Sequence, residues 1–442
     1  MWLDAWLPLW RMRLHRNARL PRATLVRRNR RRFARLASFL ARRSPYYARI
    51  MQERGIVPHR AEPEDFPVLT KADLVRHFDE IVTRPDLNRN RIEQFLASSR
   101  DPGDLLDGRY VIVHSSGTSG QLSVCAYTLA EWVQGWVRLF HALPALGPMP
   151  RRTAFVGATN GHFASISLTH TAHWLTIGHL CRTRPFDINR PWREIIDGLN
   201  EFQPHNLSCY GSILAQLSAE QERGSLHLRP RNILCGCDPL TAQDREYVER
   251  VFGVPVFDVY ATTETQVLGL SEPRSDGMVL LEDDLWIEVE QDHLLVTTLR
   301  NRTTPLVRYL IPDTVVLSPR TDFQHYPGFR RIATMAGRRE DNLRLVNEQG
   351  VEDFIHPILI AEFFIPGIDR FQVQRTSPAS FVFRVKPRGN QTAAEQEALL
   401  REARLRWQAM LAQKNMRNVR YDVTLTGDLP NDPRTGKFRL VA

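Results

Sequence analysis

Between residues 110 and 264 the sequence alternates short apolar runs with stretches of helical length. The runs are YVIVHSS, TAFVGA, HNLSCYG, NILCGC and VPVFDVYATTE, and segments such as ILAQLSAEQERG and TAQDREYVERVF follow them. A strand followed by a helix, repeated several times, is typical of a parallel α/β sheet with helices packed on it. The alternation therefore predicts the α/β fold class for this part of the chain.

The pattern changes after Gly277. The stretch MVLLEDDLWIEVEQDHLLVTTL is typical of antiparallel hairpins, and a small α+β unit begins near residue 337. That unit has expected strands around residues 343–346 and 381–385 and a helix from Ala393 to about Lys414. We therefore expect a basic helical segment at 1–43, a large domain at 44–336, and a small mobile C-terminal domain at 337–442.

The formal net charge of +10 is concentrated in arginines near the N-terminus. Leu25, Phe33, Leu36 and Leu40 recur among those arginines at near-helical spacing, which predicts an amphipathic basic helix. Such a face can meet nucleic acid, an anionic membrane or an acidic carrier protein, or it can lie across its own domain. Because no nucleic-acid motif accompanies the charge, we expect no nucleic-acid partner.

The cysteines and the apolar segments indicate which compartment the sequence suits. The 5 cysteines are scattered and odd in number, which fits reduced thiols in a cytoplasmic protein. No apolar run is long enough to span a membrane. The first residues do not form a secretory signal, because Asp4 comes early and arginines follow the apolar part instead of preceding it. We expect a monomer or homodimer without a transmembrane segment.

Polar and glycine-bearing clusters stand at the ends of several predicted strands, where ligands bind in open α/β sheets. In SSGTSG, residues 115–120, the glycines let backbone N–H groups approach an anion, and the hydroxyls add donors. The segment is thus either a phosphate loop or a flexible surface loop. It is not a Walker loop, since no lysine follows the last glycine.

Six motifs, in order, resemble those of the adenylate-forming superfamily, which includes acyl- and aryl-CoA ligases, luciferases and peptide-synthetase adenylation domains. They are YVIVHSSGTSG, LCGCDPL, VYATTE, RYLIPDTV, AGRREDNLRL and LPNDPRTGKFR. FPVLTKADL and SVCAYT are most similar to the phenylacetate–CoA ligase branch. The resemblance runs from about Ser44 to the C-terminus. It implies an AMP-forming enzyme that uses ATP and Mg²⁺ to activate a carboxylic acid and passes the acyl group to a thiol, most simply that of coenzyme A.

The resemblance also implies roles in ATP binding. Residues 115–120 would hold the β- and γ-phosphates, Tyr260 would stack on adenine, and Asp313 would accept hydrogen bonds from the ribose hydroxyls. Thr263 would contact the α-phosphate, and Glu264 would ligate Mg²⁺. The full expected ATP-binding set is Ser115, Ser116, Gly117, Thr118, Ser119, Gly120, Gly236, Cys237, Asp238, Pro239, Tyr260, Ala261, Thr262, Asp313 and Arg338.

Lys437, in PRTGKFR, is the expected catalytic lysine, together with Thr263 and Glu264 as catalytic residues. It would bridge the carboxylate substrate and the α-phosphate and stabilise the charge that develops during in-line attack. Glu340 stands at the expected hinge of the small domain. The acid substrate pocket would be formed by His162, Phe163, Tyr210, Gly211 and Ala261, which permits an aryl or medium-length acid.

The sequence departs from the family at several places. GLSEPRSDGMVLLEDD lacks the cysteine and histidine that hold a structural zinc in several relatives, so we expect no zinc there. Gln121-Leu122-Ser123 replaces a common Lys-Pro-Thr, which leaves hydroxyls and amides to hold more of the phosphate charge. The acceptor can also be a carrier-protein phosphopantetheine or an amine. A non-catalytic nucleotide-binding scaffold is the alternative of another class.

Overall fold

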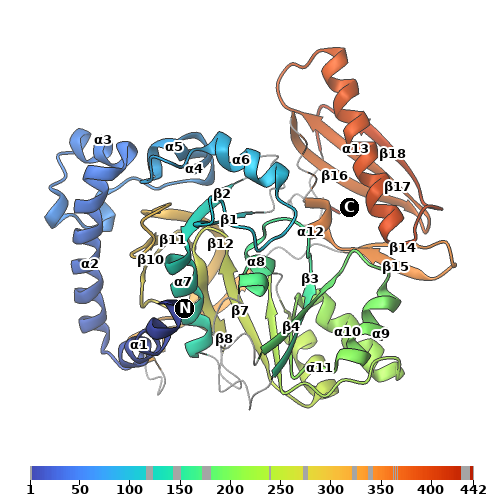
Figure 1. Cartoon of the computed structure of the whole chain (residues 1–442), viewed down its shortest axis with the longest axis horizontal. Coiled ribbons are helices and arrows are strands. Elements are labelled where there is room, and N and C mark those ends of the chain that lie inside the picture. Colours follow the sequence, from blue (N-terminus) through green and yellow to red (C-terminus); the bar gives the residue numbers. More distant parts are fainter. Residues whose placement is uncertain are drawn as a thin grey trace.

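The computed structural model describes residues 2–115, 123–142, 151–171, 181–237, 240–271, 277–320, 326–336, 342–361, 363, 365, 367–429 and 439–441. A mixed sheet of 11 strands forms its centre, the N-terminal helices lie at one end of the longest axis, and a smaller sheet with a long helix lies at the other (Figure 1). The predicted α/β class is confirmed. No helix in these ranges is long and apolar enough to cross a membrane.

The chain begins with helices that cover one edge of the large sheet. They are α1 (Trp2–Ala18), α2 (Arg22–Arg43), α3 (Pro45–Glu53), α4 (Lys71–Arg76), α5 (Phe78–Ile81) and α6 (Arg89–Ser98), with 3₁₀ turns at Pro58–Arg60 and Pro63–Asp65. Thr70 caps α4, because its hydroxyl accepts from the Asp73 N–H while the Asp73 carboxylate accepts from the Thr70 N–H. This reciprocal cap fixes where Lys71 begins the helix.

Five parallel strands form one half of the large sheet, in the spatial order β7-β6-β5-β3-β4. They are β3 (Arg151–Gly157), β4 (Cys181–Asp187), β5 (Asn206–Cys209), β6 (Asn232–Gly236) and β7 (Val256–Thr262). The connecting helices are α8 (Ala164–Thr171), α9 (Trp192–Phe202), α10 (Gly211–Arg223) and α11 (Ala242–Phe252). Their apolar stripes bury Leu199, Leu214 and Val248 against the sheet, as the alternating pattern predicts.

The other half of the sheet is antiparallel, as the sequence after Gly277 predicts. It consists of β8 (Gln266–Ser271), β9 (Met278–Leu280), β10 (Leu285–Glu290), β11 (His293–Thr298), β12 (Tyr309–Leu317) and β13 (Arg331–Ala336). β7 pairs with β8 and thereby joins the two halves. The end of β7 therefore lies in the middle of the molecule, with sheet on both sides.

The first apolar run, YVIVHSS, does not belong to the parallel sheet. Because a stretch of helical length follows it, the sequence predicts it there, and this prediction is wrong. β1 (Tyr110–His114) pairs in antiparallel register with β2 (Val124–Thr128) as a separate hairpin, and α7 (Leu129–Ala142) follows β2. VCAYT is a second strand whose short, buried pattern gives no periodic signal to separate it from a loop. The SSGTSG segment thus connects two hairpin strands instead of a strand and a helix.

The C-terminal part contains a hairpin of β14 (Leu343–Val346) and β15 (Glu352–Ile355), then α12 (Pro357–Ala361) and a sheet of β16 (Ile368–Ser377), β17 (Ser380–Pro387) and β18 (Arg420–Leu425). α13 (Ala393–Gln413) packs on that sheet through Trp407, which is fully buried. Lys414 forms a buried ion pair with Asp353, whose carboxylate also accepts from the Trp192 N–H of α9. This carboxylate ties the C-terminal part to the large sheet.

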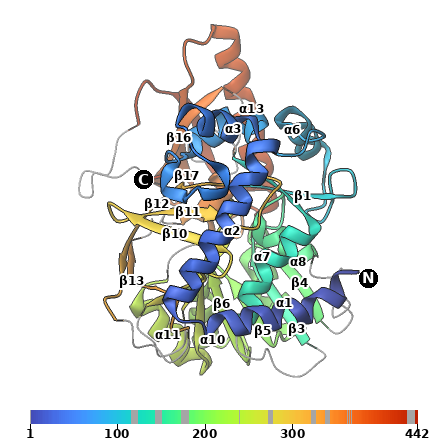
Figure 2. The ribbon, with the colours of Figure 1, turned by 90° about the vertical axis from the view of Figure 1, so that its left-hand side faces the viewer.

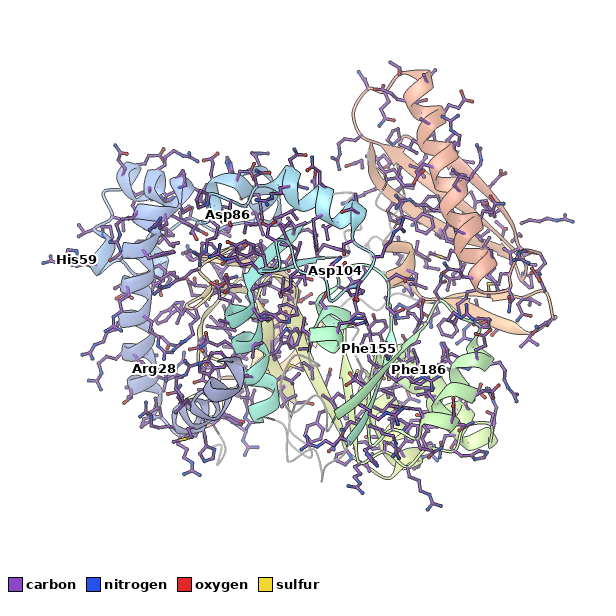
Figure 3. The ribbon with its side chains drawn as sticks, in the orientation of Figure 1. Arg28, His59, Asp86, Asp104, Phe155 and Phe186 are labelled. Atoms are coloured by element: carbon purple, nitrogen blue, oxygen red, sulfur yellow. The ribbon has the colours of Figure 1, made fainter. Side chains whose placement is uncertain are left out.

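Arginines of α1 and α2 hold the N-terminal helices against an acidic triplet between β9 and β10, residues 282–284. Arg13 Nη2 lies 2.7 Å from Asp284 Oδ2, and Arg32 Nη1 lies 2.8 Å from Asp284 Oδ1. Arg300 Nε lies 2.9 Å from the same oxygen. Arg28, labelled in Figure 3, donates to the Asp283 carbonyl. α2 therefore lies across its own domain, one of the alternatives that the basic sequence left open.

The two adjacent aspartates experience opposite environments. Burial, followed by the neighbouring Asp284 charge, raises the pKa of Asp283 to about 7, although Arg28 opposes the shift. Burial also acts on Asp284, but Arg300, Arg13 and Arg32 outweigh it and lower the pKa of that carboxyl. Asp284 is thus the ionised centre of the cluster, whereas the charge on Asp283 is unfavourable.

We predict that Asp284→Asn lowers the free energy of unfolding by about 3–5 kcal/mol, because several buried guanidinium groups lose their counter-charge. Asp283→Asn is the matched control at the next position, and it costs less than about 1 kcal/mol at pH 5, where the native carboxyl is protonated. Because the folded pKa of Asp283 is raised, the wild-type protein loses free energy of unfolding as the pH rises from about 4 to about 7. The free energy of unfolding of Asp283→Asn therefore increases relative to that of wild type as the pH rises from about 4 to about 7.

Urea denaturation of the three proteins at about pH 5 and about pH 8 measures both effects. Equal losses for the two variants at both pH values would contradict the assignment of Asp284 as the ionised partner.

Candidate active site

The SSGTSG segment begins beside a lysine that the sequence analysis did not assign to the site. Ser115 follows β1, and its N–H donates to the Ser123 carbonyl across the hairpin. Lys71, the first residue of α4, reaches this point and donates from Nζ to Ser115 Oγ over 3.1 Å. Burial lowers the pKa of Lys71, and the Glu264 carboxylate opposes that shift. The structure thus places a partly buried cation at the start of the proposed phosphate loop.

In the sequence, FPVLTKADL is informative only through its similarity to the phenylacetate–CoA ligase branch. Lys71 is 44 residues from Ser115, so no local pattern joins them. Only an indirect feature of the sequence points to Lys71: the SSGTSG segment has no lysine of its own, and the chain contains few lysines that could replace it. A lysine fixed directly behind the capping Thr70 was therefore a candidate to supply the missing charge.

Glu264 is the most strongly held carboxylate of the site. Its side chain is buried, and Oε1 accepts hydrogen bonds from Ser123 Oγ and the Tyr309 hydroxyl, each at 3.2 Å. Burial, followed by the Glu264 charge, raises the pKa of Tyr309, which keeps that phenol protonated as a donor. Among the described residues, Oε2 has no hydrogen-bond partner, so this oxygen can be offered to a ligand.

The backbone around Glu264 is fixed by a second tyrosine. The Tyr127 hydroxyl of β2 lies 2.8 Å from the Thr263 carbonyl and 2.9 Å from the Glu264 carbonyl. Thr263 Oγ1 lies 3.4 Å from the His114 carbonyl at the end of β1. The turn between β7 and β8 is therefore clamped to the β1–β2 hairpin, which brings Thr263 and Glu264 next to Ser115.

Tyr260 and Asp313 meet on the other side of the same turn. The Tyr260 hydroxyl donates to Asp313 Oδ2 over 2.7 Å, and it joins β7 to β12. Burial, followed by the Asp313 charge, raises the pKa of Tyr260, so the phenol remains a donor. An aromatic ring thus lies beside a carboxyl group, which is the pairing that adenine stacking and ribose binding would require.

The remaining predicted nucleotide contacts lie at neighbouring strand ends. Gly236 ends β6, and Cys237 follows it with a φ of +73°, a conformation that few residues other than glycine adopt. Ala261 and Thr262 end β7. These strands are neighbours and parallel, so the predicted residues share one edge of the sheet, as the α/β pattern implies.

Two histidines border the site on the α8 side. His114 N–H donates to the His162 carbonyl, and the His162 N–H lies 3.3 Å from His114 Nε2. The Phe163 ring lies 4.5 Å from the His114 ring, centroid to centroid. Gly161 has a φ of +74°, and a side chain there would approach His114 Nε2 to 3.4 Å. The predicted pocket residues His162 and Phe163 therefore pack around His114, which the sequence analysis did not assign to the pocket.

Burial keeps this pair of rings neutral. Burial, together with the neighbouring His162, lowers the pKa of His114 to about 4. Burial also lowers the pKa of His162, whose Nε2 lies 2.8 Å from Ser99 Oγ. Both rings are neutral near pH 7, so they can line an apolar pocket without repelling each other.

Tyr210 and Gly211 lie farther along the same sheet edge. The Tyr210 hydroxyl accepts from the Ala158 N–H over 3.1 Å, and its ring lies 4.9 Å from the His356 ring. Ser212 Oγ is 3.1 Å from His356 Nε2. Gly211 begins α10 and is buried. These residues join the large sheet to the segment after β15, and their role in acid binding stays a prediction.

Several predicted site residues lie outside the described ranges. They are Ser116, Gly117, Thr118, Ser119, Gly120, Asp238, Pro239, Arg338, Glu340 and Lys437. Their assignments remain predictions from the sequence.

No family model matches the chain. It is similar to phenylacetate–coenzyme A ligase of Escherichia coli (strain K12), with 24% identity over 328 residues, 68% of each protein. It is also similar to indoleacetate–lysine synthetase of Pseudomonas savastanoi, with 25% identity over 224 residues, 48% of this chain and 55% of that protein.

The fold matches crystal structures of 2-hydroxyisobutyryl-CoA ligase. An open conformation with 2-HIB-AMP and CoA has a TM-score of 0.58 at 18% identity, over 97% of this chain and 93% of that one. A complex with 2-HIB-AMP and CoA in the thioester-forming state has a TM-score of 0.61 at 19% identity, over 97% and 91%. The sequence relatives and the shared fold support the resemblance of the ordered motifs to the adenylate-forming superfamily and to its phenylacetate–CoA ligase-like branch.

Proposed function

We propose that the chain is an ATP-dependent, AMP-forming acid ligase that makes an acyl- or aryl-adenylate and transfers the acyl group to coenzyme A. One observation carries this proposal. The turn after β7 joins the Tyr260–Asp313 pair, suited to a nucleoside, to Thr263, Glu264 and the Lys71–Ser115 contact, suited to phosphates. Tyr260 joins β7 to β12, Thr263 contacts the end of β1, and Ser115 at that end contacts Lys71, so the turn after β7 links both kinds of group.

In the first half-reaction, the substrate carboxylate attacks the α-phosphorus and a new P–O bond forms. The bond to the bridging oxygen of the β-phosphate breaks, and pyrophosphate leaves. Lys71 and the Ser115 hydroxyl would hold the departing phosphates, and Thr263 would donate to the α-phosphate. In the second half-reaction, the thiol sulfur attacks the acyl carbonyl, the thiol proton is lost and AMP leaves.

Glu264 fits a magnesium ion. Oε1 is held by Ser123 and Tyr309, and Oε2 has no hydrogen-bond partner among the described residues, which suits a hard cation that prefers carboxylate and phosphate oxygens. A bound Mg²⁺ would neutralise phosphate charge. The residues of this chain would contribute the carboxylate ligand and the clamped turn that holds it.

We assign the second step to the C-terminal part. Residues 337–442 would act as a small domain that turns about Glu340, and Lys437 would leave the site between the two half-reactions. The hydrogen bond from the Trp192 N–H of α9 to Asp353 of β15 joins the large domain to residues 337–442, so such a turn would break or re-form it.

An amine acceptor is the second candidate, because indoleacetate–lysine synthetase is among the sequence relatives. A carrier-protein thiol is a third. The three acceptors share the first half-reaction and differ only in the nucleophile, so the same adenylating site serves each of them.

We predict that the protein catalyses exchange of pyrophosphate into ATP when a suitable acid is present. The panel should include phenylacetate, indoleacetate, benzoate, 2-hydroxyisobutyrate and medium-chain fatty acids. At least one acid should support exchange, and AMP release should then require coenzyme A, a holo carrier protein or lysine. Binding of ATP without exchange for any acid would favour the non-catalytic scaffold instead.

Lys437→Ala should reduce adenylation by about 100-fold or more, because the variant lacks the charge that stabilises in-line attack. Transfer from a supplied acyl-adenylate to coenzyme A should stay within about threefold of wild type, since Lys437 acts only in the first step. Pyrophosphate exchange measures the first half-reaction, and thioester formation from the supplied acyl-adenylate measures the second. Equal loss in both would contradict this role.

Lys71→Met should reduce adenylation by about 10²-fold and raise KM for ATP, because the phosphate loop lacks its own lysine. Lys71→Arg should recover part of the rate, since it keeps a positive charge at the loop. Lys386→Met, on β17, is the matched control and should leave both constants unchanged. An adenylation rate for Lys71→Met equal to that of the control would show that Lys71 only supports the loop structure.

A further inference from the structure

The helix α2 has three faces with different partners. Its buried face carries Leu25, Asn29, Phe33, Leu36, Ala37 and Leu40. Beside it, Arg22 pairs with Glu282, and Arg32 pairs with Asp284. The outer face carries five exposed arginines that have no acidic partner among the described residues: Arg27, Arg31, Arg35, Arg42 and Arg43. Of the nine arginines in α2, only some are therefore used to hold the fold together.

The outer arginines stand on successive turns. Arg27, Arg31 and Arg35 are spaced four residues apart, which places them above one another on one helix face. Like charges at this spacing repel and destabilise a helix. The chain offers no carboxylate to relieve that repulsion in the described structure, although it does so for the flanking arginines. This row is thus suited to an anionic partner outside the molecule.

α1 extends the same surface with apolar side chains. Leu9, Met12 and Arg16 recur at helical spacing and share the outer face of α1, opposite the buried Leu14. Leu9 is 53% exposed and Met12 is 68% exposed. Figure 2 shows α1 and α2 lying together across the side of the molecule that forms the left of Figure 1. We call the outer faces of these two helices the α1–α2 surface.

We propose that the α1–α2 surface binds peripherally to an anionic lipid bilayer. The arginines would contact lipid phosphates, while Leu9 and Met12 would enter the boundary between headgroups and acyl chains. Exposed basic residues at a membrane surface each add to binding when the lipids are anionic. The combination of apolar and basic side chains on one exposed helical face is the pattern of interfacial helices.

An acidic carrier protein fits this surface less well. Its thiol arm would have to reach the site at the end of β7 and Asp313 on β12. In the large sheet, β10 and β11 lie between the α2 edge and β12 (Figure 1). By helical spacing, the exposed row of Arg27, Arg31 and Arg35 lies on the side of α2 opposite its buried residues. A surface formed by two long helices matches an extended planar partner better. This inference concerns binding alone and does not depend on the proposed ligase activity.

Sedimentation of the full chain with lipid vesicles tests the proposal. The vesicles contain phosphatidylcholine alone or equal amounts of phosphatidylcholine and phosphatidylglycerol. We expect the anionic vesicles to bind at least about tenfold more tightly, and we expect Arg27→Glu/Arg31→Glu/Arg35→Glu to weaken that binding by about tenfold or more. The control, Arg229→Glu/Arg231→Glu/Arg401→Glu, changes the net charge equally at exposed positions on other faces and should bind like wild type.

Leu9→Ser/Met12→Ser separates apolar insertion from charge. The binding of this variant to anionic vesicles should be several-fold weaker than that of wild type. At high salt its binding should vanish, whereas wild type should keep part of its binding, because screening removes only the electrostatic contribution. Circular dichroism and pyrophosphate exchange should match wild type for all three variants, since none changes a residue of the site.

The proposal is overturned if wild type binds both kinds of vesicle equally or neither kind. It is also overturned if the two arginine triple variants lose binding to the same extent, since net charge alone would then explain the result. Binding of polyglutamate through Arg27, Arg31 and Arg35, without binding of vesicles, would assign the surface to an acidic protein instead.

Discussion

The hydrogen bonds around Glu264 are the interactions on which the candidate site depends. Ser123 and Tyr309 hold its carboxylate, and Tyr127 holds its backbone carbonyl. These three residues come from the β1–β2 hairpin and from β12, whereas Glu264 lies in the turn that joins the parallel and antiparallel halves of the large sheet. A buried carboxylate is stable only when its oxygens are paired. Its burial therefore forces three distant segments to meet at one place.

The same turn links the residues that the proposed function assigns to the nucleoside of ATP with those that it assigns to the phosphates. The Tyr260–Asp313 pair lies on one side, and Lys71 with Ser115 lies on the other. The family loop often carries its own lysine, whereas here a lysine from the N-terminal helical region approaches the loop from outside. Because Lys71 is partly desolvated, its charge acts in a medium of lower dielectric constant, where it interacts more strongly with phosphate than an exposed lysine would.

The arginines of α1 and α2 divide into an internal set and an external set. Arg13, Arg28 and Arg32 surround the buried aspartates at 283 and 284, and the helices thereby become part of the large domain. The rest of the basic charge stays on the surface, where Arg27 and Arg31 face outward. The sequence shows one basic amphipathic segment and cannot separate these sets, because the acidic partners lie more than 250 residues away along the chain.

Local patterns were sufficient to predict the α/β class, the antiparallel region after Gly277 and the shared strand edge that carries Tyr260 and Gly236. Strand and helix periodicity depends on neighbouring residues, so the sequence alone reveals it. The tertiary structure alone decided that β1 forms a separate hairpin and that Lys71 contacts Ser115. It also decided that the pKa of Asp283 is raised while that of Asp284 is lowered. Each of these depends on groups brought together from distant parts of the chain. Desolvation and charge pairing depend on distances in the folded protein, and the separation of residues along the sequence does not determine those distances.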